Sequence, residues 1–246
     1  MKWIFTPDEF SYVWAAETGL ERRPYPVNLA PASVVRTESE LAALRLPQRF
    51  ARQADPDLAA ALMLCARPDA TAVTLSGERS VLPRNGESPE TEQILGFAAV
   101  IEHHAAVLHA TATRVTVQMC QAHELGGRLV ALIGSARRGT HGPLREPQEA
   151  VLTDAPIPGR DAAGDAALFR KTLREPVDSR GFLTVTVAPD DPMSPPTRHR
   201  SWLDIRGDGR YLLTTADVLI LDPVGDTEFA GKLLGLAGIR ARTPRL

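Results

Sequence analysis

The chain begins with Met1-Lys2-Trp3-Ile4-Phe5-Thr6-Pro7-Asp8-Glu9-Phe10-Ser11-Tyr12-Val13-Trp14, which contains a complete helix start. Thr6 can accept a backbone hydrogen bond as the N-cap, and Glu9 can close a capping box with it. Pro7 suits the first helical position, because its missing N–H would have no partner there. We therefore expect a helix from Pro7 to about Gly19, a residue suited to ending a helix.

Aromatic side chains concentrate around this helix start. The chain has thirteen Phe, Trp and Tyr residues, and the first 25 residues contain Trp3, Phe5, Phe10, Tyr12, Trp14 and Tyr25. Each large aromatic side chain buries about 150–250 Å². Phe10, Val13 and Trp14 recur at helical spacing and share one face. We expect this face to pack into a core, so the segment is predicted to be structural and not a loose tail.

The composition is typical of a soluble globular protein. Of 246 residues, 43% are hydrophobic and 24% are charged, which disfavours disorder. The net charge of −2 offers no electrostatic footprint for nucleic acid. No apolar run reaches the length of a transmembrane helix or of an export signal. Cys65 and Cys120 are expected to be buried thiols in a reducing compartment. These features predict a cytoplasmic protein with no membrane span.

Helices lead the chain and strands follow. Capping residues predict helices from Thr37 to about Leu46 and from Pro56 to Cys65, and Pro47 and Pro68 end or kink them. Alternation with period two then predicts strands over 71–76, 93–102, 105–110 and 114–120, with a polar turn over 81–89. Asn85-Gly86 is expected at the tip of that turn. A helix from His123 to Ile133 completes this part of the chain.

The second part of the chain repeats this order of elements. A helix is predicted over 165–173, strands over 181–187, 201–205, 210–215 and 217–221, and a last helix over 227–236, which Asp226 can cap. We interpret this as an echo of architecture and not as a sequence repeat. Short connections between strands favour antiparallel pairing. The predicted fold is α+β, with two similar halves that each contain a mainly antiparallel sheet and flanking helices.

We expect one unit over residues 1–246, divided into an N-terminal half (1–135), a loop-rich connection (136–164) and a C-terminal half (165–246). The connection contains Arg137-Arg138 between Ser135 and Thr140, which invites a phosphate site. However, the chain has no Gly-x-x-x-x-Gly-Lys-Ser/Thr and no Gly-x-Ser-x-Gly motif. A solvated basic loop is therefore the favoured interpretation.

His103, His104 and His109 are the first candidates for a metal site. Neighbouring residues on a strand point to opposite faces, so His103 and His104 cannot reach one ion from the same strand. No Asp, Glu or Cys stands at a supporting spacing. We predict no metal, no cofactor and no catalytic residue. A hydrolase with an unrecognised site near His103–His109 remains the less favoured alternative.

Both ends of the chain resemble the EspG family of actinobacterial ESX (type VII) secretion-associated proteins. The likeness rests on Phe5-Thr6-Pro7-Asp8-Glu9-Phe10, Val13-Trp14, Gly19-Leu20, Pro24-Tyr25-Pro26 and Asp208-Gly209-Arg210-Tyr211-Leu212-Leu213, with the final helix. Between the ends, the likeness is one of length and element order. The resemblance implies a quasi-twofold EspG-like arrangement of two related halves, which agrees with the echo described above.

The resemblance also implies a function. It implies a cytosolic chaperone without enzymatic activity that binds the hydrophobic tip of the PPE subunit in PE/PPE heterodimers and delivers the pair for export, with possible contacts to ESX machinery components. By position, the partner-binding residues would be Val81, Leu82 and Asn85 in the first-sheet loop (77–92), and Phe229, Leu233 and Leu236 on the last helix. The chain departs from the family in Arg137–Gly142, which has little hydrophobic content. A scaffold or regulatory binding protein unrelated to secretion is the other alternative.

Overall fold

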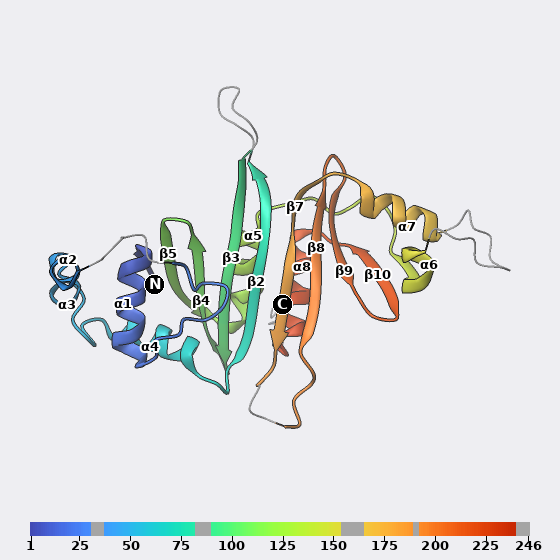
Figure 1. Ribbon diagram of the computed structural model, residues 1–246. Coiled ribbons are helices and arrows are strands. Elements are labelled where there is room, and N and C mark those ends of the chain that lie inside the picture. The colour runs from blue at the N-terminus through green and yellow to red at the C-terminus, as the bar shows by residue number, and fades with distance from the viewer. Residues whose placement is uncertain (31–36, 82–89, 154–164, 189–191, 240–246) are drawn as a thin grey trace, which may run out of the picture.

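The computed structural model describes residues 1–30, 37–81, 90–153, 165–188 and 192–239 (Figure 1). Among these residues, ten strands form one sheet in the order β1-β5-β4-β3-β2-β7-β8-β9-β10-β6. The strands are β1 (Lys2–Phe5), β2 (Thr71–Val81), β3 (Glu90–Ile101), β4 (His104–Thr111), β5 (Arg114–Gln121), β6 (Leu144–Pro147), β7 (Val177–Thr186), β8 (Arg198–Ile205), β9 (Gly209–Thr214) and β10 (Val218–Pro223). The helices are α1 (Pro7–Thr18), α2 (Glu38–Ala43), α3 (Leu46–Arg49), α4 (Pro56–Ala66), α5 (Leu125–Ile133), α6 (Gln148–Leu152), α7 (Asp165–Arg174) and α8 (Asp226–Leu236), and the 3-10 helix η1 (Ala122–Glu124) precedes α5.

The sheet consists of two quasi-equivalent halves, which confirms the predicted fold class. Strands β2 to β5 form one antiparallel meander and β7 to β10 form the other, and each meander is followed by a helix, α5 or α8. Each half gains one more strand at its outer edge, β1 beside β5 and β6 beside β10. The halves join where β2 pairs with β7 in antiparallel register, with Gly77 opposite Gly181.

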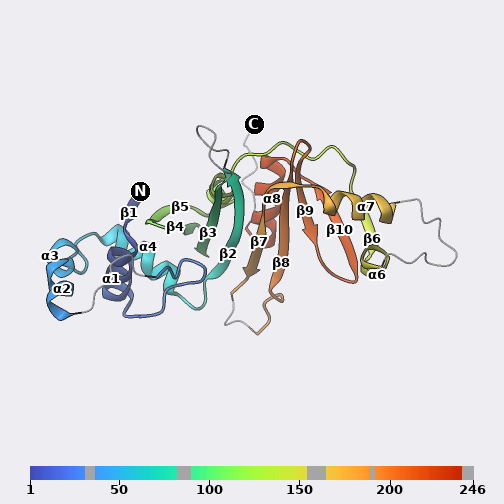
Figure 2. The same cartoon turned by 45° about the horizontal axis from the view of Figure 1, so that its top comes forward.

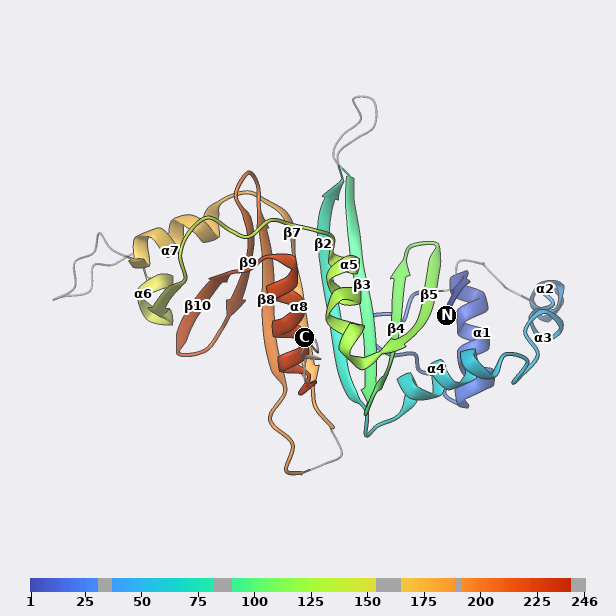
Figure 3. The same ribbon diagram turned by 180° about the vertical axis from the view of Figure 1, so that it is seen from behind.

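Helices cover the two faces of the sheet in different places. Figure 3 shows α5 and α8 side by side over the centre of one face, which we call the helix face. On the opposite face, which we call the open face, α1 and α4 pack at one end and α6 and α7 at the other (Figures 1 and 2). Buried residues follow this division into three hydrophobic clusters, one under each group of helices. The centre of the open face therefore has no helix over it among the described residues.

The predicted helix start is confirmed. Glu9 N donates to Thr6 Oγ1 at 3.3 Å, Thr6 N donates to Glu9 Oε2 at 2.9 Å, and Gly19 ends α1 with a φ of 72°. Trp14 is 1% exposed, and its indole N–H donates to Arg22 O at 3.1 Å. The residues before the cap form β1, which was not predicted, because a strand of four residues is too short to show a period.

Replacing Trp14 with alanine should lower the free energy of unfolding by about 3–5 kcal/mol, because the indole is part of the core under α1 and α4. Urea denaturation measures this change. Tyr25→Ala is the control, since Tyr25 lies in the same neighbourhood but is 61% exposed. Equal stability of the Trp14→Ala variant and the wild type would show that α1 is peripheral to the fold.

Helices α5 and α8 contact each other through small residues. A Cβ added to Gly126 would lie 2.9 Å from the carbonyl carbon of Ala230, so only glycine permits this approach. The contact also shows a short repeat that the sequence analysis had not expected. Glu124-Leu-Gly-Gly-Arg-Leu129 and Glu228-Phe-Ala-Gly-Lys-Leu233 correspond position by position. The echo between the halves thus extends to sequence where the two helices meet.

Gly126 and Gly127 are adjacent on α5 but should respond to alanine in opposite directions. Gly126→Ala should destabilise the protein by about 1–3 kcal/mol, because the new methyl group would collide with the α8 backbone. Gly127→Ala should stabilise it by up to about 1 kcal/mol, because nothing lies within 4 Å of its added Cβ and alanine favours helix. Thermal and urea denaturation of the two variants measure the difference. The same sign of change in both would contradict the α5–α8 contact.

The segment over 136–164 contains more regular structure than predicted. β6 and α6 lie within it, and Leu144 of β6 pairs with Leu221 of β10. The strand is too short to show a period, and it forms because the edge of β10 offers a partner. The proposed division into halves stays a prediction. Among the described residues, no helix is long and apolar enough to cross a bilayer.

Candidate partner-binding face

A groove of about 680 Å³ lies at the centre of the open face, between the two groups of end helices. Its lining comes from β2, β3, β7, β8, β9 and α7 and the residue after β9, and comprises Ser76, Gly77, Glu78, Gln93, Leu173, Arg180, Gly181, Phe182, Ser201, Leu203, Leu213 and Thr215. The groove therefore spans the junction of the two halves. A volume of this size is within the range of ligand and peptide pockets.

Phe182 is the most prominent apolar residue of this groove, with 68% of its surface exposed. The register places Ser76 on one side of it and Ser201 on the other. These small neighbours cannot cover the ring, so it stands free on the sheet. Leu203, Leu213 and Leu173 are half-buried beside it. An exposed aromatic ring next to partly buried leucines is the composition of a protein-binding surface.

The charges in the groove neutralise each other. Glu78 and Arg180 are the charged residues of the lining, and Arg180 Nε donates to Glu78 Oε1 at 2.7 Å. Both side chains remain substantially exposed, so this pair contributes little to stability. Apart from this ion pair, the groove presents apolar and uncharged polar groups, and its lining carries no net charge.

Of the three predicted loop residues, the structure describes Val81. Val81 is the last residue of β2 and is 40% exposed. Leu82 and Asn85 lie outside the described residues. Val81 is on the strand that carries Ser76 and Glu78, but alternation along β2 places it on the opposite face of the sheet from these two groove residues. That Val81 contacts a partner stays a prediction.

The predicted residues of the last helix lie elsewhere. Phe229 is 0% exposed and Leu233 is 2% exposed, and both pack on the helix face. Leu236 is half-buried in the same cluster. A partner could contact Phe229 or Leu233 only after α8 moved, so the binding surface proposed below does not include them. The apolar side chains of Phe229 and Leu233, spaced four residues apart on α8, pack into the core.

The three candidate histidines do not come together. His103 and His104 are exposed at the turn between β3 and β4, while His109 is half-buried on β4. Burial lowers the pKa of His109 below its ordinary value. Within the described ranges, no group of three or more His, Cys, Asp and Glu side chains is placed to hold a metal ion.

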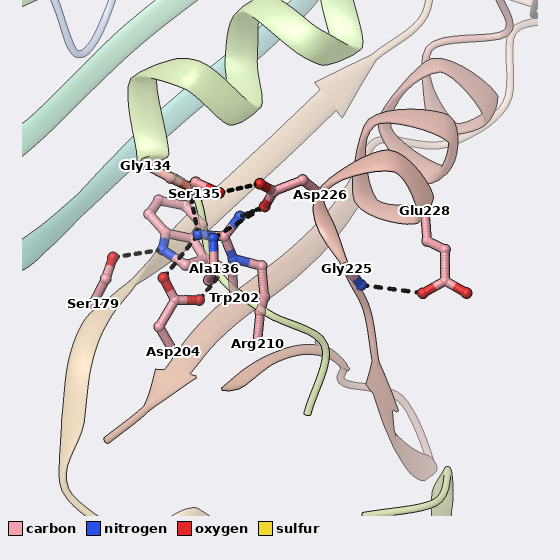
Figure 4. Close-up of polar contacts among 10 residues, drawn as sticks. All are labelled: Gly134, Ser135, Ala136, Ser179, Trp202, Asp204, Arg210, Gly225, Asp226 and Glu228. Carbon is pink, nitrogen blue, oxygen red and sulfur yellow. Dashed lines mark hydrogen bonds and ion pairs between the residues drawn. The ribbon is translucent and has the colours of Figure 1, made fainter. Parts of the chain in front are cut away.

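A polar cluster around Arg210 fastens the segment that follows α5 (Figure 4). Arg210 is fully buried on β9, and its guanidinium donates to both carboxylate oxygens of Asp204 at 2.7 and 2.8 Å. It also donates to Gly134 O at 2.8 Å and to Asp226 Oδ1 at 3.2 Å. Asp226 in turn accepts from Ser135 Oγ. Asp226 was predicted to cap the last helix, but it is the first residue of α8 and its carboxylate belongs to this polar cluster. Gly225 is the N-cap residue instead.

The basic stretch at 137–140 is exposed, as predicted, but it is not a loose loop. Arg137 donates to the carbonyls of Gly207 and Asp208, and Arg138 pairs with Glu228. Thr140 donates to Asp208 through both its N–H and its hydroxyl. Arg137, Arg138 and Thr140, which suggested a phosphate site, thus form hydrogen bonds and ion pairs within the protein.

Asp208 and a buried tyrosine complete this attachment. Tyr211 donates its hydroxyl to Asp208 Oδ2 at 2.5 Å. Burial raises the pKa of the Asp208 carboxyl, but hydrogen bonds from Thr140 and Tyr211 outweigh it and hold the pKa below its usual value. Burial, with the bond to Asp208, raises the pKa of Tyr211 to about 12. The segment is thus held by charged and neutral hydrogen bonds.

Arg210→Met should lower the free energy of unfolding by about 3–5 kcal/mol, because it leaves the carboxylates of Asp204 and Asp226 without their buried counter-charge. Arg206→Met is the matched control. Arg206 pairs with Asp178 on the surface, where an ion pair contributes at most about 1 kcal/mol. Urea denaturation of both variants tests this contrast, and equal effects would contradict the structural role of the cluster.

Together, the fold and the groove define a class of protein, an α+β chain of two quasi-equivalent halves with an apolar, uncharged surface at their junction. The family model described as EspG family matches residues 6–233. The chain therefore belongs to the EspG family. This confirms the resemblance seen at the two ends of the sequence. A comparison with curated proteins finds no match.

The chain is also similar to a solved structure, the Mycobacterium tuberculosis type VII secretion system chaperone EspG5 in complex with the PE25-PPE41 dimer. The TM-score is 0.62, the sequence identity is 14%, and 94% of each chain is covered. At this identity, the likeness shows the fold, and it confirms the predicted α+β fold class over nearly the whole chain.

Phe182 was not among the predicted binding residues, although the sequence contains a signal for it. In the strand predicted over 181–187, Gly181, Leu183 and Val185 alternate with Phe182 and two threonines. Phe182 is thus an apolar residue on the polar face of its strand. Only the placement of the helices shows that, in the part of the chain that the structure describes, none covers that face at this point (Figures 1 and 2).

Proposed function

We propose that this protein is a chaperone of a type VII secretion system, which binds PE/PPE-like heterodimers, shields their hydrophobic tip and delivers them for export. The observation that carries the proposal is membership of the EspG family over residues 6–233. The shared fold with EspG5, solved in complex with the PE25-PPE41 dimer, supports the same class of partner. We propose contacts to ESX machinery components as a second step, after the client is bound.

The open face supports this proposal physically. A chaperone that shields an apolar tip needs an apolar patch with a polar surround. Phe182 and its leucine neighbours provide such a patch, and Ser76, Ser201 and Gln93 provide polar surroundings.

We also propose that the protein acts in the cytoplasm and without catalysis. A client with an exposed apolar tip needs protection before export, so its chaperone belongs on the side where the client is made. Binding and shielding need surface complementarity and no reacting group. Turnover of any substrate by the purified protein would contradict the non-enzymatic part of the proposal.

Co-expression with the PE/PPE-like pairs encoded beside ESX components in the genome of origin tests the function. The wild-type chain should co-purify with at least one such pair. Val81→Asp should weaken this binding, because a client that contacts the end of β2 would have to desolvate a carboxylate. Its melting temperature should stay unchanged, since Val81 is exposed at a strand end.

Met63→Asp is the matched control, because Met63 is a 47% exposed apolar residue on α4, away from the groove. It should bind like the wild type. Full binding by Val81→Asp would move the site away from the end of β2. A wild-type chain that binds none of these pairs would contradict the chaperone function itself.

A further inference from the structure

We infer that the groove is one-sided and binds an uncharged, apolar client tip in a single orientation, with Phe182 as its central anchor. This inference rests on the proposed function and specifies which surface and which client chemistry carry it. The groove residues of one half differ in chemistry from the residues at equivalent positions in the other half.

The quasi-twofold relation passes through the pairing of Gly77 with Gly181. Because β2 and β7 are antiparallel there, the position after Gly77 corresponds to the position after Gly181. Glu78 and Phe182 are therefore equivalent by fold but opposite in chemistry. One half contributes a carboxylate where the other contributes an exposed phenyl ring.

The rest of the lining shows the same difference. From the N-terminal half, the groove receives Ser76, Gly77, Glu78 and Gln93. From the C-terminal half it receives every large apolar side chain of the lining, namely Phe182, Leu203, Leu213 and Leu173 of α7, together with Arg180, Ser201 and Thr215. The large apolar groups therefore all lie on β7, β8, β9 and α7, whereas β2 and β3 supply only small or polar residues.

This arrangement determines the chemistry of the occupant. A client tip with one apolar side can place that side against Phe182 and its uncharged polar groups against Ser76 and Gln93. The reverse orientation would put apolar groups against the Glu78–Arg180 ion pair, whose exposed charged groups would lose water without gaining a new partner. Glu78 and Arg180 already neutralise each other, so charge complementarity selects a tip without charged residues.

Binding of the co-expressed PE/PPE-like pair to purified variants tests the inference. Phe182→Ala should weaken binding at least about thirtyfold, as expected for a central aromatic anchor. Tyr25→Ala removes another exposed ring at the far end of the molecule and should leave binding unchanged. Both variants should melt at the wild-type temperature, because neither ring is part of the core.

A second pair of variants tests the one-sidedness. Phe182→Ala/Glu78→Phe moves the ring to the equivalent position of the other half, and Phe182→Ala/Glu78→Ala removes the same carboxylate without adding a ring. Both should bind as weakly as Phe182→Ala, because the leucine wall lies on one side. Recovery of binding by Phe182→Ala/Glu78→Phe alone would overturn the inferred orientation.

Two further measurements test the inference: the effect of salt on the affinity for the client pair, and the mass of the protein without the client pair. Affinity for the pair should change little between about 0.1 and 1 M salt, and a steep loss would overturn the uncharged interface. Without the client pair, the wild type and the Phe182→Ala variant should have the same mass by light scattering. If the wild type is a dimer and the Phe182→Ala variant is a monomer, the groove binds a second copy of this chain and the inference is overturned. Unchanged client binding by Phe182→Ala overturns this inference only, whereas no binding by the wild type overturns the proposed function and this inference with it.

Discussion

The close contact of β2 and β7 under the indole ring of Trp202 is the constraint on which the rest of the structure depends. Trp202 is fully buried and lies across Gly77 and Gly181, and a Cβ on Gly77 would stand 2.6 Å from its Cζ2 atom. Its indole N–H donates to Ser179 Oγ at 3.1 Å. Two glycines therefore leave room for one large ring at the point where the halves meet, and the sheet continues through the junction.

This junction explains both the covered and the uncovered parts of the sheet. The helix that follows each meander packs on the helix face, and the two helices meet where Gly126 lies against Ala230. Helices α1 and α4 pack at one end of the open face, and α6 and α7 pack at the other (Figures 1 and 2). The groove at the centre is what this symmetric arrangement leaves free, and the chemistry of Glu78 and Phe182 then makes it asymmetric. The fold leaves the centre of the sheet uncovered, and single side chains make the two sides of the groove chemically different.

The segment after α5 shows how burial changes the meaning of a sequence feature. Arg137 and Arg138 look like an anion site in the sequence, yet both are bonded to the turn and helix around Arg210. The desolvated guanidinium of Arg210 needs Asp204 and Asp226, which come from different elements. Buried ion pairs between distant positions have no periodic pattern, so their roles could not be assigned from spacing.

The sequence by itself determined the first helix with its capping box, most strands, the last helix and the two-halved order, because caps and periods are local properties. It also carried the family resemblance at both ends. Only the tertiary structure decided that the halves share one sheet, that β1 and β6 exist, and that Phe229 and Leu233 belong to the core while Phe182 stays exposed. The physical reason is that an apolar residue on a strand or helix is buried only where another element covers it, and which element lies over which face is a long-range property.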